Sequence, residues 1–166
     1  MVTQKVTHFK VSGVVAIVAT AVLLSSCHII DNPPRTLQMD AFKGNKRAVN
    51  RFLSEGVSVN ARGEQGERAL HYAVYGKQES MVKLLLAKGA DVDVKNDNGR
   101  TPLHAAAWKG YVDIARALIA GGANVNAKDN KGMRPLDSAA EQGREGMMEF
   151  LRNHGAIRGT QEDKKP

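Results

Sequence analysis

Two histidines separated by a fixed interval are the side chains best suited to chemistry in this sequence. His71 and His104 lie 33 residues apart, and a pair of imidazoles can bind a transition metal or transfer protons near neutral pH. The same interval leads forward from His104 to Asp137 and backward from His71 to Gln38. Because different side-chain types occupy this regular series, we interpret it as a repeated structural position and predict no metal site.

Other candidates for catalysis are few. Glu141, Glu145 and Glu149 recur at helical spacing and offer an acid and base pair, but we expect them on a solvent-facing surface. The sequence contains no HExxH motif, no GxSxG motif and no phosphate-binding glycine loop. We therefore predict that the protein is not an enzyme and uses no metal ion, no cofactor and no small-molecule substrate.

The single cysteine, Cys27, follows a distinctive N-terminal leader. Lys5 and Lys10 precede an uncharged apolar stretch over residues 11–24, which is typical of an export signal and shorter than the ~20 residues of a transmembrane helix. Residues 24–27 (LSSC) resemble the lipobox of bacterial lipoproteins. We therefore expect residues 1–26 to be a signal peptide. An ordinary cleaved signal peptide and an uncleaved anchor are the alternatives.

The lipobox resemblance implies a covalent lipid and a location. Cys27 would carry diacylglycerol on its sulfur and an acyl chain, such as palmitate, on its amino group, and two or more chains give stable anchoring. Residues 27–34 contain two consecutive prolines and are predicted to be a short, stiff tether. Residue 28 is His, not the Asp that resembles an inner-membrane retention signal. We expect a lipid-anchored protein of the bacterial envelope that faces the periplasm, at the outer membrane.

The composition favours one packed domain. The chain has 166 residues, of which 42% are hydrophobic and 25% are charged, a mixture typical of globular proteins. The net charge of +7 is dispersed, since four consecutive blocks of 33 residues from residue 35 carry +2, +2, +2 and 0. We therefore predict no nucleic-acid binding. One small basic cluster is interpreted as a solvated face or a contact for anionic lipid headgroups; it comprises Lys43, Lys46, Arg47 and Arg51.

A period of 33 residues organises the rest of the chain. Leu37, Leu70, Leu103 and Leu136 keep this spacing without a slip. Residues 101–106 (TPLHAA) closely resemble the signature of the ankyrin repeat. The resemblance implies an all-α repeat solenoid in which each repeat is a helix-turn-helix followed by a hairpin tip. We predict four repeats over residues 35–158, at 35–67, 68–100, 101–133 and 134–158, followed by a disordered tail over 159–166.

Local sequence agrees with this architecture. Thr101 is a good N-cap and Pro102 suits the first helical position, so a short helix is predicted to begin there. Gly110 permits a turn into a second helix over residues 112–120. The second repeat departs from the pattern, because Gly76 comes one residue before the expected glycine column and Lys77 occupies that column. The first repeat lacks the TPLH motif and is expected to be loosely formed.

The resemblance assigns different roles to two columns. His71 and His104 would make hydrogen bonds that tie one repeat to the next. Phe42, Tyr75 and Trp108 end the first helices and would face a concave groove as an aromatic ladder that contacts a partner, unless each ring packs on its own repeat. The other partner-binding candidates come from three places. Glu141 is the fourth member of the aromatic column, and Lys109 and Gln142 belong to the column after it. Arg100, Asp97, Asn98 and Lys131 lie at or beside the hairpin tips.

The resulting prediction is a membrane-tethered module for protein recognition that is a monomer when free. One hypothesis is an immunity or inhibitor protein that neutralises an exported toxin, such as a lipase acting in the periplasm. The alternative is an envelope scaffold that holds or stabilises another envelope protein or enzyme. The sequence does not name the partner.

Overall fold

A computed structural model describes residues 36–158 of the chain. The expected signal peptide (1–26), lipidated Cys27, the tether (27–34) and the tail (159–166) lie outside the described residues. The repeats predicted from residue 35 onward can therefore be followed from the first helix to residue 158.

The described part consists of eight α-helices arranged as four consecutive pairs, with no β-strand between residues 36 and 158. The all-α repeat architecture expected from the sequence is confirmed. The helices are α1 (Leu37–Phe42) and α2 (Lys46–Ser54), α3 (Ala69–Tyr75) and α4 (Glu79–Ala87), α5 (Pro102–Lys109) and α6 (Val112–Ala120), and α7 (Pro135–Glu141) and α8 (Glu145–Asn153). One short 3-10 turn, η1 (Glu64–Gly66), lies in the loop after α2. No helix in residues 36–158 is long and apolar enough to cross a membrane.

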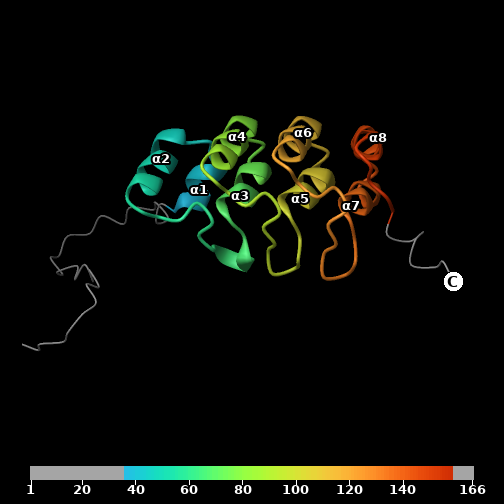
Figure 1. The fold of residues 1–166 in the computed structure, drawn as a ribbon, viewed down its shortest axis with the longest axis horizontal. Coiled ribbons are helices and arrows are strands. Elements are labelled where there is room, and N and C mark those ends of the chain that lie inside the picture. Colours follow the sequence, from blue (N-terminus) through green and yellow to red (C-terminus); the bar gives the residue numbers. More distant parts are fainter. Residues whose placement is uncertain (1–35, 159–166) are drawn as a thin grey trace, which may run out of the picture. The chain divides into compact units, whose positions relative to one another are not determined.

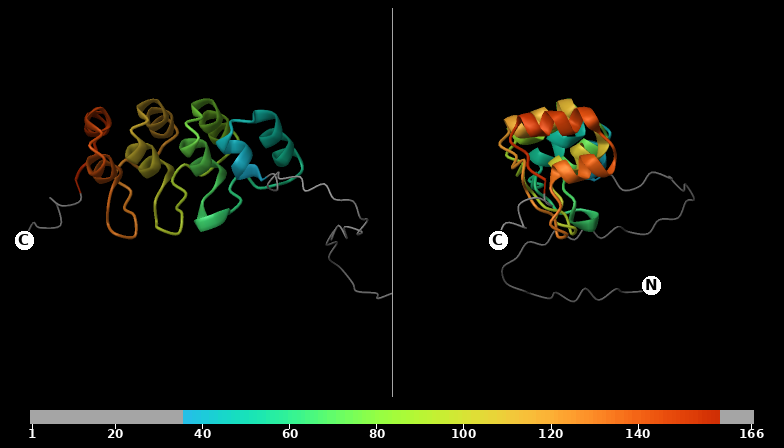
Figure 2. Two further views of the ribbon diagram at one scale, coloured as in Figure 1. Left: turned by 180° about the vertical axis from the view of Figure 1, so that it is seen from behind. Right: turned by 90° about the vertical axis from the view of Figure 1, so that its right-hand side faces the viewer.

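The helices form two rows. The first helices, α1, α3, α5 and α7, lie side by side in one row, and α2, α4, α6 and α8 form the other (Figure 1). The loops that join one pair to the next extend past the first-helix row on the side away from the second helices, as both views of Figure 2 also show. The row of first helices is therefore flanked by the projecting tips, and this arrangement positions the candidate site.

Capping side chains fix where the helices begin. Thr101 is the N-cap of α5 and Pro102 is its first residue, a position where the missing N–H of proline has no cost. Thr36 Oγ1 accepts a hydrogen bond from the Met39 N–H at 3.2 Å, and Asn45 Oδ1 accepts from the Ala48 N–H at 3.2 Å. Both helices of the first pair are therefore formed and capped, whereas the sequence predicted a loose first repeat.

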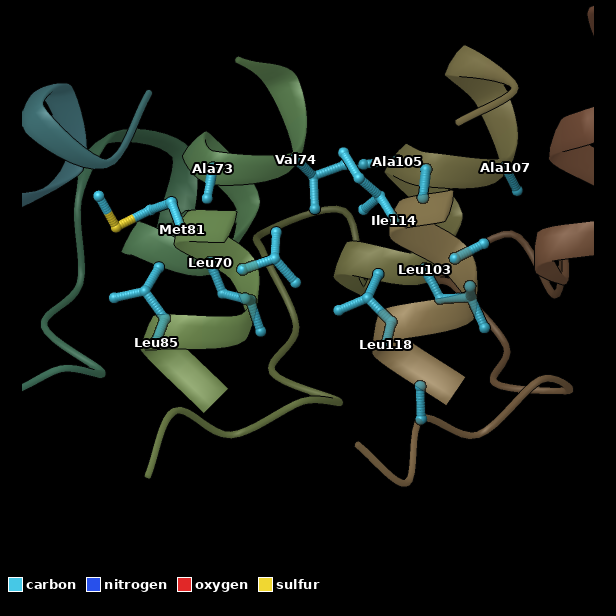
Figure 3. Close-up of a cluster of buried hydrophobic side chains, with 14 of the residues drawn as sticks. Leu70, Ala73, Val74, Met81, Leu85, Leu103, Ala105, Ala107, Ile114 and Leu118 are labelled. Carbon is cyan, nitrogen blue, oxygen red and sulfur yellow. The ribbon is translucent and has the colours of Figure 1, made fainter. Parts of the chain in front are cut away.

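The 33-residue leucine column forms the core. Leu37, Leu70, Leu103 and Leu136 are at most 3% exposed. Figure 3 shows Leu70 and Leu103 in one buried cluster with Leu85 and Leu118 of the second helices. Burying one leucine contributes ~1.5–3 kcal/mol, and each pair shares its apolar surface with its neighbours. This sharing explains why the stack depends on several repeats.

The displaced glycine of the second repeat has a structural reason. A Cβ atom on Gly76 would lie 2.0 Å from the carbonyl oxygen of Phe42 in the preceding pair, far closer than any side chain tolerates. Lys77 then adopts the left-handed conformation, with φ of 55°, that Gly44 and Gly110 adopt after their own first helices. Close packing between the first two pairs therefore requires glycine at 76, and a non-glycine residue carries the strained backbone at 77.

A buried acid distinguishes the first pair from the others. Asp40 is 3% exposed and occupies the column that Ala73, Ala106 and Ala139 fill in the later repeats. Its Oδ1 accepts a hydrogen bond from Asn45 Nδ2 at 3.2 Å, whereas its Oδ2 has no hydrogen-bond partner in the described part of the chain. An unpaired buried carboxylate oxygen lowers stability, so this position is a weak point of the first repeat.

Candidate functional site

Aromatic side chains from three successive helix pairs line one groove. Phe42 at the end of α1, Tyr75 at the end of α3 and Trp108 near the end of α5 reach the same hollow, whose volume is about 440 Å³. We call this hollow the aromatic groove; its other lining residues are Arg100, His104, Ala105 and Lys109. Three members of the 33-residue column therefore line one hollow.

The outer two rings are accessible to a partner. Phe42 is 42% exposed and Trp108 is 36% exposed, although both are large apolar side chains that burial would favour. No ring contact joins Phe42, Tyr75 and Trp108 to one another within residues 36–158; the rings line a hollow and do not stack. Such exposed rings around a concave surface are the type of site that holds an apolar anchor from another protein.

Tyr75 is fixed at the centre of the groove. Its hydroxyl donates a hydrogen bond to Glu67 Oε1 at 2.5 Å, and its ring meets the Tyr72 ring edge-on with 6.3 Å between centroids. Burial, followed by this bond to Glu67, raises the pKa of Tyr75 above its ordinary value. Tyr75 therefore remains a neutral phenol at physiological pH and presents an immobilised ring.

Two cations border the rings. Lys109 Nζ lies 4.8 Å from the centroid of the Trp108 ring, within cation–π distance. Arg100 Nε donates to Asp129 Oδ2 at 3.3 Å. Burial acts to raise the pKa of Asp129, but N–H groups of Met133 and Lys131 and the Arg100 guanidinium outweigh it and lower the pKa. Asp129 is therefore a stable anion that positions the Arg100 side chain.

The tip residues lie beside the groove and form a second, smaller hollow. Asp97, Asn98 and Lys131 are exposed, and Asp97 pairs with Arg62 of the preceding tip. Backbone bonds join the tips, from the Asp97 N–H to the Gln65 carbonyl at 2.9 Å and from the Asn130 N–H to the Asn98 carbonyl at 3.0 Å. A hollow of about 240 Å³ between the last two tips is lined by Asn98, Arg100, Asp129, Asn130 and Lys131. Arg100 is common to both hollows.

The candidates on the last pair are not brought into the groove. Glu141 and Gln142 are exposed at the end of α7, but neither lines the aromatic groove. The aromatic groove is lined by residues of the first three helix pairs and the loop between the second and third. It ends before the fourth pair, where Glu141 replaces the aromatic residue of the column.

The two histidines connect neighbouring repeats. His71 Nε2 lies 3.1 Å from the Arg100 carbonyl oxygen and His104 Nε2 lies 3.0 Å from the Met133 carbonyl oxygen. In both residues Nδ1 accepts a backbone N–H, from Arg68 at 3.3 Å and from Thr101 at 3.1 Å. These partners require the neutral Nε2–H form, and burial lowers the pKa of both imidazoles. Across residues 36–158, no three His, Cys, Asp or Glu side chains are grouped so that they could hold a metal ion.

A third column of polar contacts was not assigned a role from the sequence. Asn60 Oδ1 accepts from the Asp91 N–H at 3.0 Å, Asp93 Oδ1 from the Asn124 N–H at 3.0 Å, and Asn126 Oδ1 from the Ile157 N–H at 2.9 Å. The signal was present, because residues 60, 93 and 126 are 33 apart and all carry a short carbonyl-bearing side chain. These bonds tie the loop after each of the first three pairs to the segment that follows the next pair.

A comparison with protein families finds one matching model, described as ankyrin repeats (3 copies), over residues 19–96, 37–129 and 80–163. The matches overlap and together cover most of the chain. No curated protein matches the sequence.

Proposed function

The chain belongs to the ankyrin repeat family, and we propose that it is a lipid-anchored recognition module of the bacterial envelope whose aromatic groove holds a partner protein. Ankyrin repeats form protein–protein interaction modules and are typically not catalytic. The observation that carries the proposal is the convergence of Phe42, Tyr75 and Trp108 on one hollow, with two of these rings at least 36% exposed.

The size and chemistry of the surface support this role. A volume of about 440 Å³ accommodates a few side chains of a partner, and the exposed tips beside it extend the contact area toward the ~800 Å² per partner of an ordinary specific interface. Tyr and Trp supply large contact area at low entropy cost.

The proposed location rests on the sequence of the leader. A basic start, an apolar stretch and the LSSC lipobox precede Cys27, and a diacylated cysteine would hold the module at the membrane surface, facing the periplasm. The test is incorporation of labelled palmitate, which we expect in the wild type and not in Cys27→Ala. Equal labelling of both proteins would refute the lipid anchor.

The biological role that we propose is inhibition of an exported toxin. A groove tethered beside the membrane could block an enzyme that attacks that membrane, such as a lipase delivered into the periplasm. A strain that lacks this protein should be killed by toxin-producing siblings and rescued by the wild-type gene. Unchanged survival of the deletion strain would contradict inhibition, and would leave a scaffold for another envelope protein as the alternative.

Affinity capture tests the recognition proposal itself. The full chain would be recovered from native envelopes and the bound proteins identified by mass spectrometry, in parallel with a variant that carries Phe42→Ala, Tyr75→Ala and Trp108→Ala. We expect one protein to be captured by the wild type and lost from the variant. The matched control is Leu86→Ala, which also removes a large, partly buried side chain but lies on α4, outside the groove. The same captured proteins from wild type and the triple variant would refute binding in the groove.

A further inference from the structure

The aromatic groove contains cations and no carboxylate. Its lining consists of three rings, Ala105, the neutral His104 and the cations Arg100 and Lys109. Two acids that bond its lining residues already have partners, since Glu67 accepts from the Tyr75 hydroxyl at 2.5 Å and Asp129 accepts two backbone N–H groups and Arg100. The groove therefore combines apolar surface with two cations, of which Arg100 is paired with Asp129 and Lys109 forms no ion pair within residues 36–158.

Both cations retain donors that nothing in the described residues satisfies. Arg100 is held through Nε by Asp129, and its two terminal nitrogens make no hydrogen bond within residues 36–158. The Lys109 ammonium makes no hydrogen bond or ion pair in this part of the chain and lies 4.8 Å from the centroid of the Trp108 ring. In the free protein, water solvates these donors. A partner that covers the groove removes this water, and an anionic group restores the lost interactions best, because its charge-assisted hydrogen bonds are stronger than those of a neutral acceptor.

We propose that the groove recognises an acidic segment of its partner, in which a large apolar side chain lies beside a carboxylate. The apolar side chain inserts among Phe42, Tyr75 and Trp108, while the carboxylate accepts hydrogen bonds from the terminal nitrogens of Arg100 and from Lys109. Arg100 suits this role because Asp129 fixes its orientation before binding, so little side-chain entropy is lost. This inference rests on the proposed function, whose site it shares.

A displayed peptide library identifies the preferred segment directly. The probe is a library of random twelve-residue peptides without tryptophan, selected on the full chain in detergent. Peptides selected on the wild type should carry Phe, Leu or Ile next to Asp or Glu. Trp108 is the sole tryptophan of the chain and lies in the groove, so its fluorescence reports binding of each synthetic peptide without a label.

Neutralising variants test the charge. Arg100→Gln combined with Lys109→Gln retains the Arg100 carbonyl that accepts from His71, and should weaken a selected peptide by about tenfold or more. Replacing the peptide's Asp or Glu by the amide should cause a similar loss. Lys88→Gln is the matched control, because Lys88 is exposed at the end of α4 and outside the groove; it should bind as the wild type does. Arg100→Lys retains the charge and should retain part of the affinity, and thermal unfolding verifies that each variant is folded.

The outcomes separate this inference from the proposed function. Selected peptides without acidic residues, or equal binding by the wild type and the Arg100→Gln, Lys109→Gln variant, would overturn the acidic specificity and leave the groove as the binding site. No selection above the level of the triple alanine variant of Phe42, Tyr75 and Trp108 would refute both. An acidic, apolar consensus that depends on both cations supports both.

Discussion

Replacement of Gly76 by alanine tests the packing that builds the groove. The added Cβ would lie 2.0 Å from the Phe42 carbonyl oxygen, 2.9 Å from its carbonyl carbon and 3.1 Å from its Cα. These atoms are backbone, so no side-chain rotation relieves the overlap, and the first helix pair must move away from the second. Because Phe42 belongs to the groove, the same movement should disturb binding.

The expected magnitude follows from two opposing terms. Overpacking lowers the free energy of unfolding by about 1–3 kcal/mol. Replacing glycine by alanine raises it by about 0.4–1 kcal/mol, because the unfolded chain then has less conformational entropy. We therefore expect the free energy of unfolding to fall by about 1–2 kcal/mol in Gly76→Ala. Urea denaturation followed by circular dichroism measures it.

Gly146→Ala is the matched control for this experiment. Gly146 lies inside α8, and a Cβ there meets no atom within 4 Å. Alanine at this position therefore causes no overpacking, and only its higher helix propensity and the lower entropy of the unfolded chain affect stability. We expect this variant to be more stable than the wild type by about 0.5–1 kcal/mol. Equal effects of the two substitutions, or a Gly76→Ala variant as stable as the wild type, would refute the close packing inferred at Phe42.

Three further changes should alter stability in defined directions. Burial lowers the folded-state pKa of His71 and His104, so below pH ~6.5 the unfolded chain binds more protons than the folded chain and the free energy of unfolding should fall. Urea titrations between pH 8 and pH 5 measure this loss, which should be smaller in His104→Gln; a pH-independent stability would contradict it. Asp40→Ala should stabilise the protein by at most about 1 kcal/mol, because it removes an unpaired buried oxygen at a column that is otherwise alanine, and the loss of the Asn45 hydrogen bond offsets part of this gain; a lower melting temperature would refute this. Thr101→Ala should cost about 1–2 kcal/mol in urea denaturation, because it removes the N-cap of α5 and the contact between Thr101 Oγ1 and His104 Nδ1 at 2.9 Å, and an unchanged midpoint would count against that cap.

The fold could be predicted because its signals are local and repeated. The leucine column, the Thr101 and Pro102 cap and the helix over residues 112–120 each follow from spacing and from the conformational preferences of single residues, and the structure has these features. The leader and Cys27 stay predictions, since they lie outside the described residues.

The contacts within the site could not be predicted from the sequence alone. The spacing placed Phe42, Tyr75 and Trp108 on one face, but the bond between Tyr75 and Glu67 and the fixing of Arg100 by Asp129 depend on how consecutive loops pack. The displacement of Gly76 was visible in the sequence, and its cause, the Phe42 carbonyl of another repeat, was not. The 33-residue spacing shows which residues share a face of the repeats. Whether their side chains line one hollow depends on how the helix pairs pack against one another.

Site-specific crosslinking in living cells tests the central claim most directly. A photoreactive benzoylphenylalanine at position 42, which is 42% exposed at the groove, would be compared with the same group at Arg116, which is exposed on α6 of the second-helix row. The account predicts one envelope protein crosslinked from position 42 and none from position 116. Crosslinks from position 116 alone would place recognition on the second-helix face and contradict binding in the aromatic groove.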